Sequence, residues 1–267
     1  MKLTVLVDNT TYTGETNIGE PGACYFIEDD DKKILLDTGF SDVCLKNAEK
    51  LGVDLGSVTD IILSHGHNDH TGGLRFLPEK LKNGVTITAH PDMFDKKYHR
   101  GKEIGCPVSS DELSKKYNLR LSATPIKISK NITFLGYIQR TNDFENKTPV
   151  GKFESGGELK DDYLTDDSAI VYESKDGIYI ISGCSHSGIC NIIEYSKKVT
   201  GNNNVLGVLG GFHLLEKGEQ LQKTIEYFKE KNITNLYPCH CVCFKARSEI
   251  DRNIPITDVA VGFMTEW

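Results

Sequence analysis

The sequence lacks any run of about 18 consecutive apolar residues, the length that a membrane-spanning helix requires. Its first ten residues contain one lysine and a short apolar run but no small-residue cleavage site. They therefore predict a first strand and not an export signal. We expect a cytoplasmic protein without membrane contact. In that compartment the eight cysteines are expected to be thiols or metal ligands, because disulfides belong to oxidising compartments.

An excess of positive charge is also missing. Lys and Arg total 31 and Asp and Glu total 38, which gives a formal net charge of -7. Nucleic-acid-binding proteins usually carry a basic stripe, so we expect no nucleic-acid partner and instead a small-molecule substrate. No Pro-, Ser- or Gly-rich linker divides the chain, so we expect one domain over residues 1–267. The sequence carries no signal for the oligomeric state.

Short β-rich runs alternate with helical stretches in both halves of the chain. Strands are expected over 2–8, 23–29, 32–39, 60–67, 84–91, 168–174, 177–183, 205–214 and 233–241. Helices are expected over 41–52, 188–201 and 221–232, the first with Ser41 as its N-cap. Two halves of this order predict an α/β fold, in which two sheets pack face to face with helices outside.

Two polar segments interrupt this order. Residues 92–118 are Lys-rich without a clear period, and we interpret them as a surface insertion that is partly helical. Residues 139–167 are acidic and contain glycines, and we interpret them as a long loop. Because a long loop inside a compact domain is usually functional, we expect it to lie beside the active site.

The stretch LSHGHNDHTGG, residues 63–73, places three histidines and an aspartate within six positions directly after a buried strand. His65 and His67 are two residues apart, so their side chains can point the same way at the end of that strand. Asp69 and His70 follow in the next turn, where glycines allow the chain to bend back. Imidazole and carboxylate are ligands of zinc and iron. We therefore predict that His65 and His67 hold one metal and that Asp69 and His70 hold a neighbour.

More ligands must come from distant parts of the chain. His186, His213 and His240 each lie at or just past the end of an apolar strand. Strand ends meet at one edge of a sheet, where sites form. We predict that His186 and His240 are metal ligands, and that His213 is either a ligand or a proton donor that faces the substrate.

The motif H-x-H-x-D-H after a strand resembles the metallo-β-lactamase superfamily. Longer stretches resemble one branch of it, the dihydropterin-ribofuranosylaminobenzene-phosphate synthases: residues 32–74, 138–145, 166–193, 210–214 and 237–241. The resemblance implies an αββα sandwich of two mixed sheets flanked by helices, with one or two metals at one edge. Zinc is the expected metal, with iron or manganese as alternatives. The resemblance also implies that Asp37 orients a ligand of the histidine turn and that His240 is the last metal histidine.

The chain departs from the superfamily pattern at the position of a bridging Gly-Asp. Gly183-Cys184 stands there, and Thr165 to Asp167 replace the stretch in which a metal histidine is usual. We expect His186 to replace that histidine. Cys184 either supplies the bridging ligand as a thiolate or is a small buried residue beside a weak second site; the sequence alone leaves both open, as it does a role for residues 165–167.

A metal lowers the pKa of its bound water to about 7, which supplies hydroxide at neutral pH. We therefore predict a hydrolase that acts on a small phosphorylated or ester substrate, with Asp37, Asp69 and His213 as catalytic groups. Arg140 is the predicted anchor for a phosphate, and Glu145 is expected to orient it. The alternatives are a transferase of the dihydropterin type, in which the metal acts as a Lewis acid, and a metal-binding sensor without catalysis.

Two further patterns bear on the chemistry. Cys239, Cys241 and Cys243 alternate, so on a strand they would share one face, as buried thiols or as a redox patch. Their spacing is not that of iron–sulfur clusters. A flavin-linked di-iron oxidoreductase is disfavoured, because such proteins show Glu at the position of His67 and an attached flavin domain.

Overall fold

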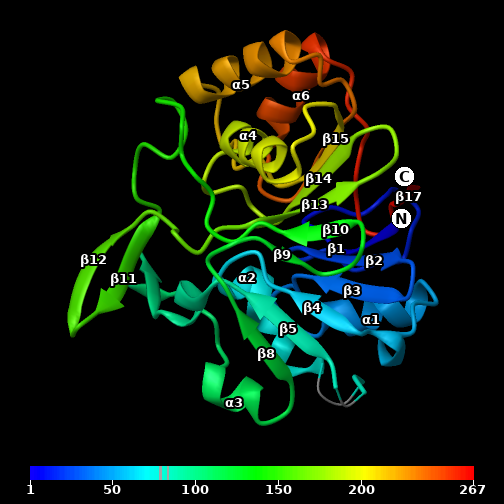
Figure 1. The fold of residues 1–267 in the computed structure, drawn as a ribbon, viewed down its shortest axis with the longest axis vertical. Coiled ribbons are helices and arrows are strands. Elements are labelled where there is room, and N and C mark those ends of the chain that lie inside the picture. Colours follow the sequence, from blue (N-terminus) through cyan, green and yellow to red (C-terminus); the bar gives the residue numbers. More distant parts are fainter. Residues whose placement is uncertain (78–79, 83) are drawn as a thin grey trace.

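Two β-sheets stack face to face and carry helices on their outer sides (Figure 1). The computed structural model describes residues 1–77, 80–82 and 84–267. The first sheet has seven strands in the order β17 (Met264–Glu266), β1 (Lys2–Val7), β2 (Cys24–Asp29), β3 (Lys32–Leu36), β4 (Asp60–Ile62), β5 (Thr86–Ala89) and β8 (Asn118–Leu121). The second has six, in the order β16 (Leu236–Pro238), β15 (Val205–Gly210), β14 (Ile178–Ser182), β13 (Ala169–Glu173), β10 (Ile132–Phe134) and β9 (Ile126–Lys127). Both sheets contain parallel and antiparallel pairs.

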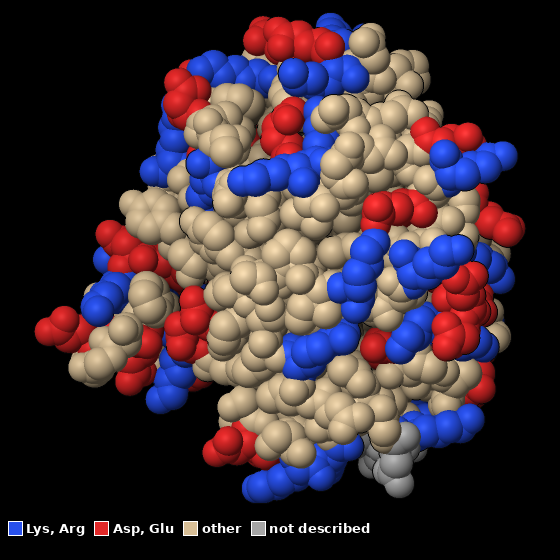
Figure 2. Space-filling view, viewed as in Figure 1, with Lys and Arg blue, Asp and Glu red and all other residues tan. Residues whose placement is uncertain are grey.

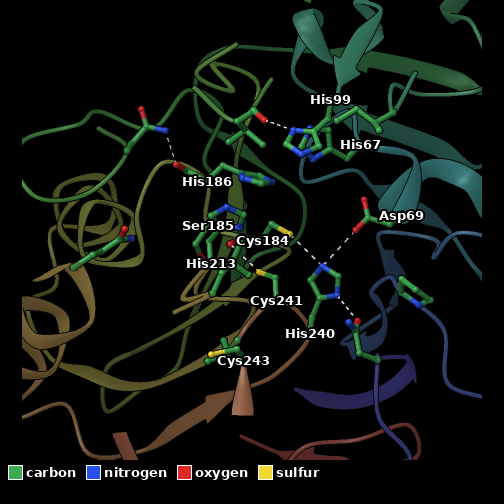
Figure 3. Close-up of a pocket in the computed structure, with 18 of the residues that line it drawn as sticks. His67, Asp69, His99, Cys184, Ser185, His186, His213, His240, Cys241 and Cys243 are labelled. Atoms are coloured by element: carbon green, nitrogen blue, oxygen red, sulfur yellow. Dashed lines mark hydrogen bonds and ion pairs between the residues drawn. The ribbon is translucent and has the colours of Figure 1, made fainter. Parts of the chain in front are cut away.

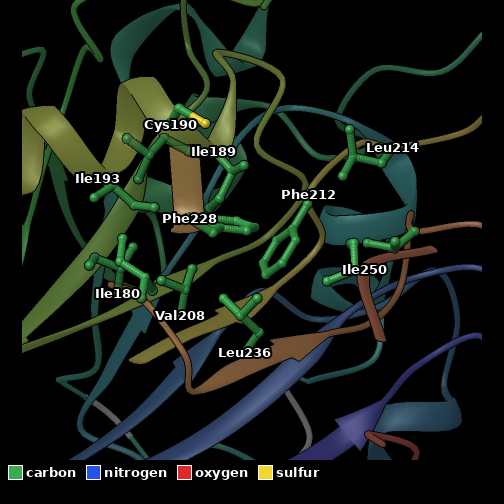
Figure 4. Packing of buried hydrophobic residues seen from close by; sticks show 14 of the residues in the cluster. Ile180, Ile189, Cys190, Ile193, Val208, Phe212, Leu214, Phe228, Leu236 and Ile250 are labelled. Atoms are coloured by element: carbon green, nitrogen blue, oxygen red, sulfur yellow. The ribbon is translucent and has the colours of Figure 1, made fainter. Parts of the chain in front are cut away.

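Three apolar layers hold these elements together. The layer between the sheets is built from inward-facing strand residues such as Tyr25, Phe134 and Leu209. A second layer joins the first sheet to α1 (Val43–Lys50). A third joins the second sheet to α4 (Ile189–Thr200), α5 (Glu219–Glu230) and α6 (Phe244–Asn253), with Phe212 packed against Phe228 at its centre (Figure 4). The predicted αββα sandwich is therefore confirmed.

Two short helices and a third sheet complete the described part of the chain. The helices are α2 (Asn68–Thr71) and α3 (Ser110–Ser114), and the sheet has the order β12 (Glu158–Asp162), β11 (Gly151–Ser155), β6 (Lys97–His99) and β7 (Lys102–Glu103). In Figure 1 the β11–β12 hairpin projects away from the sandwich. It turns on Gly156 and Gly157, which both have positive φ.

The third sheet changes the description of two segments. Residues 139–167 are not one long loop, because their second half is this hairpin. The segment 92–118 is partly α-helical, as expected, through the five residues of α3, but it also contains strand β6, which pairs with β11 and was not predicted. Charged residues recur along both segments, and neither face of the hairpin is apolar. The sequence therefore lacks the apolar alternation from which strands are predicted.

Several element ends differ from the prediction. Asp42, not Ser41, is the N-cap of α1, and its side chain makes no capping hydrogen bond; the Ser41 hydroxyl instead accepts from the N–H of Val43 at 3.3 Å. The strands expected over 205–214 and 233–241 end early, at Gly210 and Pro238. Helix α6 was not predicted at all. Only Ala246 and Ile250 of this helix are buried, so it shows little amphipathic period.

Within the described ranges, no helix has the length and apolar character needed to cross a membrane. Figure 2 shows basic and acidic side chains intermixed on one face of the molecule. That face therefore carries no large patch of a single charge sign.

Candidate metal centre

The histidine turn is compressed against the loop before β6. A Cβ atom on Gly66 would lie 2.1 Å from the carbonyl oxygen of Met93, so only glycine fits there. This close approach brings the flanking imidazoles together, with His65 Nε2 3.0 Å from His67 Nδ1. The turn then runs directly into α2, which carries Asp69 and His70.

The first set of donors, here called the histidine group, is His65, His67 and His186. One donor atom from each lies within 4.8 Å of the other two. His186 reaches the turn from the loop after β14, in the opposite sheet. Burial lowers the pKa of His67 to about 4 and holds the pKa values of His65 and His186 well below their usual range. All three are therefore neutral at pH 7, the form that binds metal.

The second set, the aspartate group, is Asp69, His70 and His240. Its donor atoms also lie within 4.8 Å of one another, and His70 Nε2 is 3.1 Å from His240 Nε2. Burial acts to lower the pKa of His70, but the charges of Asp69 and Asp37 outweigh it and raise that pKa to about 9. The site thus favours positive charge at this position, whether from a proton or from a metal cation.

Hydrogen bonds fix which nitrogen of each ring faces the centre. Asp37 Oδ2 lies 2.7 Å from His70 Nδ1, and the same carboxylate accepts from the backbone and hydroxyl of Ser64. Asn9 Oδ1 lies 2.8 Å from Nδ1 of His240. In both rings Nε2 is thereby turned inward, as in metal sites where a second residue orients the ligand. Asp37 lies where the resemblance implied.

Cys184 lies between the two groups. Its Sγ is 3.2 Å from His70 Nε2 and 3.1 Å from His240 Nε2, and it also forms a donor set with His65 and His70. Burial raises the pKa of this thiol well above its usual value. A bound cation would reverse that effect, because a coordinating thiol is deprotonated by its metal. Of the two roles considered for Cys184, this position favours the ligand.

Asp166 and Asp167 brace the two ligand-bearing loops. Asp166 accepts from the backbone N–H of Gly66 at 2.8 Å and from buried Lys97 at 2.9 Å. Asp167 accepts from the backbone and hydroxyl of Ser187, next to His186. In the described donor sets neither aspartate takes part. Asp166 and Asp167 therefore position candidate ligands from both sheets.

Arg140 and Glu145 do not lie where we expected. Arg140 Nη2 donates to the carbonyl oxygens of Tyr163 and Leu164, at 2.7 and 2.8 Å, so it holds the loop together. Glu145 is buried, and its carboxylate accepts from the N–H groups of Cys190 and Asn191 at the start of α4. Because a helix N-terminus attracts a carboxylate, Glu145 caps α4 and does not orient Arg140. Neither residue lines the pocket described below.

The alternating cysteines do not share a strand face, because β16 ends at Pro238. Cys239 is buried with its sulfur 3.3 Å from the Tyr25 hydroxyl. Cys243 is the N-cap of α6 and accepts from the N–H of Ala246. Only Cys241 directs its sulfur toward the centre, where it joins Cys184 and His213 in a third donor set, the thiol group. Among the described residues all eight cysteines are free thiols.

Strained backbone collects at this centre. Asp37, Ser185, His213 and His240 all have φ between 50° and 60°, which is unfavourable for residues with a Cβ atom. Such strain persists only where the surrounding structure holds it, and it is typical of functional sites.

Members of all three groups line a cavity of about 870 Å³, among them His67, Asp69, His186 and Cys241 (Figure 3). This volume suits one small-molecule ligand. The cavity is bounded on its other sides by residues 146–150 and by the start of α6, which contribute Lys147 and Arg247. Neither cation was predicted from the sequence, because a single Lys or Arg in a polar segment does not by itself indicate a binding site.

The residues present fit a metal. His67 Nε2 and both ring nitrogens of His186 are buried and have no hydrogen-bond partner among the residues described. Buried polar atoms are rarely left unsatisfied, and each such atom needs a partner. Neutral imidazoles, a carboxylate and thiols are together the ligand set of zinc, and imidazole and carboxylate also suit iron.

Comparison with known proteins identifies relatives of this chain. The chain is 36% identical over 251 residues to an uncharacterised protein of Methanocaldococcus jannaschii, with 93% of each chain covered. It is 32% identical over 228 residues to the 7,8-dihydropterin-6-methyl-4-(β-D-ribofuranosyl)-aminobenzene-5'-phosphate synthase of the same organism, covering 81% of this chain and 78% of the other.

Among solved structures, Tm1679, described as a metal-dependent hydrolase of the β-lactamase superfamily, superposes with a TM-score of 0.85 at 31% identity. The match covers 100% of this chain and 99% of that one. Zinc-bound PqqB from Methylobacterium extorquens shares the fold, with a TM-score of 0.62, 12% identity and full coverage of both chains. The family model of the metallo-beta-lactamase superfamily matches residues 17–197, and the chain belongs to that superfamily.

Proposed function

We propose that the protein is a metal-dependent hydrolase of a small phosphorylated or ester substrate, with one or two zinc ions held by the histidine and aspartate groups. The observation that carries this proposal is the convergence of both groups, from two sheets, on one cavity wall. His65, His67 and His186 would hold one ion, and Asp69, His70 and His240 the other. Cys184, which contacts the second group, would lie between the two ions.

When bound, a divalent cation polarises a carbonyl or phosphoryl oxygen and lowers the pKa of a water molecule beside it. Asp69 is placed to accept the proton of the attacking water, because its carboxylate borders the cavity and is 29% exposed. His213 is placed to donate a proton to the leaving group. Burial acts to lower its pKa, but contact with Cys241 and the charge of Asp167 outweigh this and raise it.

The cations of the cavity support an anionic substrate. Lys147 and Arg247 border the cavity from different segments, and Arg247 Nε is buried without a partner in the described part of the chain. A guanidinium binds phosphate through paired hydrogen bonds. Leu215 and Val150 add apolar surface to the same cavity, so the substrate would carry an apolar part as well as a phosphate.

One observation favours a second candidate. The 32% identity to a dihydropterin-ribofuranosylaminobenzene-phosphate synthase supports a transferase that joins a pterin to a phosphorylated aminobenzene riboside. The metal would then assist departure of a leaving group, and Lys147 and Arg247 would bind the phosphate in either reaction.

Metal content tests the proposal directly. Plasma mass spectrometry on protein purified without oxygen should find about one or two zinc or iron ions per chain. His67→Ala and His186→Ala should each lower that content. His90→Ala is the matched control, because His90 is also buried but lies outside the cavity.

Metal-loaded protein would next be assayed on phosphoesters, carboxylic esters and pterin diphosphates. Turnover that His213→Ala lowers, while the histidine and aspartate groups keep their metal, would support the assigned roles. No metal in the parent protein, even after it is added back, would refute the proposal. Full metal content with no turnover on any substrate would favour a binding protein.

A further inference from the structure

Three neighbouring strands deliver the thiol group to one edge of the second sheet. Strands β14, β15 and β16 run parallel and lie side by side, with Ser182 opposite Gly210 and Gly210 opposite Pro238. Cys184, His213 and Cys241 follow these strand ends within two or three residues. Because parallel strands end at the same edge, the three side chains meet there.

The local geometry holds the two sulfur atoms near each other. Donor atoms of Cys184, His213 and Cys241 lie within 4.8 Å of one another, and Cys241 Sγ is 3.3 Å from the carbonyl oxygen of Cys184. A Cβ atom on Gly211 would lie 2.5 Å from Cys241 Sγ. Glycine at 211 therefore leaves the space that the Cys241 thiol occupies. Figure 3 shows both thiols on the same side of the pocket as His213.

The thiol group differs from the neighbouring cysteines, whose sulfur atoms have structural roles. The sulfur of Cys243 is engaged at the start of α6 and that of Cys239 lies beside Tyr25, so both contribute to packing. By contrast, Cys241 borders the cavity, and His213 Nδ1 is buried without a hydrogen-bond partner in the residues that the structure describes. The thiol group thus presents Cys241 and an unpartnered ring nitrogen of His213 at the cavity.

We infer that Cys184, His213 and Cys241 form a sulfur-containing cation site beside the two histidine-bearing groups, and that it takes a thiophilic ion such as zinc. The inference rests on the proposed metal centre, because Cys184 borders both. Two thiolates and one imidazole are three of the four ligands of a tetrahedral zinc site.

Two consequences follow for the chemistry of the site. Each thiol releases its proton to solvent when the cation binds, so uptake of one ion releases two protons. Thiolate ligands favour zinc and monovalent copper, whereas magnesium and manganese prefer oxygen. The thiol group would therefore select zinc over manganese, a preference that imidazole and carboxylate ligands alone would not impose as strongly.

Cobalt absorption tests the inference without an activity assay. Metal-stripped protein would be loaded with Co²⁺, and thiolate-to-cobalt charge transfer in the near ultraviolet would be measured together with bound cobalt. We expect this absorption in the parent protein and its partial loss in Cys184→Ser and in Cys241→Ser. Cys243→Ser is the matched control: it also borders the cavity, and we expect no change, because its sulfur caps α6.

The outcomes separate this inference from the proposed function. Cobalt bound without charge-transfer absorption, or absorption that Cys241→Ser leaves intact, would overturn the thiol site while the histidine-bearing groups stand. Failure to bind any cobalt would overturn both. Cadmium NMR of the parent protein gives a second measurement that needs no variant. A resonance shifted downfield by two sulfur ligands is expected, and one typical of nitrogen and oxygen ligands alone would refute the site.

Discussion

Replacement of Lys97 by methionine is the sharpest test of how the centre is supported. Lys97 in β6 is 2% exposed, and its ammonium lies 2.9 Å from Asp166 and 3.2 Å from Asp162, both buried. Methionine keeps most of the side-chain volume but removes the charge. Two carboxylates would then face each other without a cation, and one of them holds the backbone of Gly66 in the histidine turn.

The expected loss is large. Burial acts to lower the pKa of Lys97, but the charges of Asp166 and Asp162 outweigh it and raise that pKa, so the lysine is charged in the folded protein. Removal of one partner from a buried ion pair destabilises a protein by about 3–5 kcal/mol. At about 2–4 °C per kcal/mol for chains near this size, the melting temperature should fall by roughly 6–20 °C.

Thermal and urea unfolding of Lys97→Met would measure this loss. Lys152→Met is the control, since Lys152 pairs with Asp161 on the same small sheet but both side chains are 51% exposed. Exposed pairs contribute about 0–1 kcal/mol, so the control should change little. Equal losses in the two variants, or a loss below about 1 kcal/mol in Lys97→Met, would refute the claim that a desolvated ion pair supports the turn.

Three further outcomes follow from the site. Arg247→Gln should raise KM for a phosphorylated substrate by roughly 10- to 100-fold with little change in kcat, since it removes a charged hydrogen bond; steady-state kinetics would show it, and an unchanged KM would contradict the anchor. Glu145→Ala should lower the free energy of unfolding by about 1–3 kcal/mol, because two buried N–H groups lose their acceptor, while metal content stays constant; a loss of metal would contradict the capping role. Chelation should lower the melting temperature, because it removes about 3 kcal/mol from the free energy of unfolding where free zinc had been about 100-fold above its Kd. Calorimetry with and without chelator measures the shift. No shift would mean that no metal binds the folded state selectively.

Much of the centre could be predicted because its signals are local. The spacing of His65, His67, Asp69 and His70 lies within six residues, and the apolar strands before His186 and His240 are clear in the sequence. Residues that follow parallel strands lie at the same edge of a sheet. The predicted strands were therefore enough to predict that these residues lie close together.

The parts that escaped prediction depend on contacts between distant segments. Cys241 was assigned to a strand face because its neighbours alternate, but Pro238 ends the strand and the chain then turns. Glu145 looked like a partner for Arg140 in sequence, whereas the start of α4, more than 40 residues away, takes its carboxylate. The third sheet was missed for a related reason, since its strands pair across the chain without an apolar face.

Adjacent aspartates in one short segment brace ligands that come from opposite sheets. Asp166 fixes the turn that carries His65 and His67, and Asp167 fixes the loop that carries His186. A designer who copied only the ligands onto another sandwich would thus lose the element that sets their separation. Residues 166–167 would have to be transplanted as part of the centre, although neither belongs to any of its donor groups.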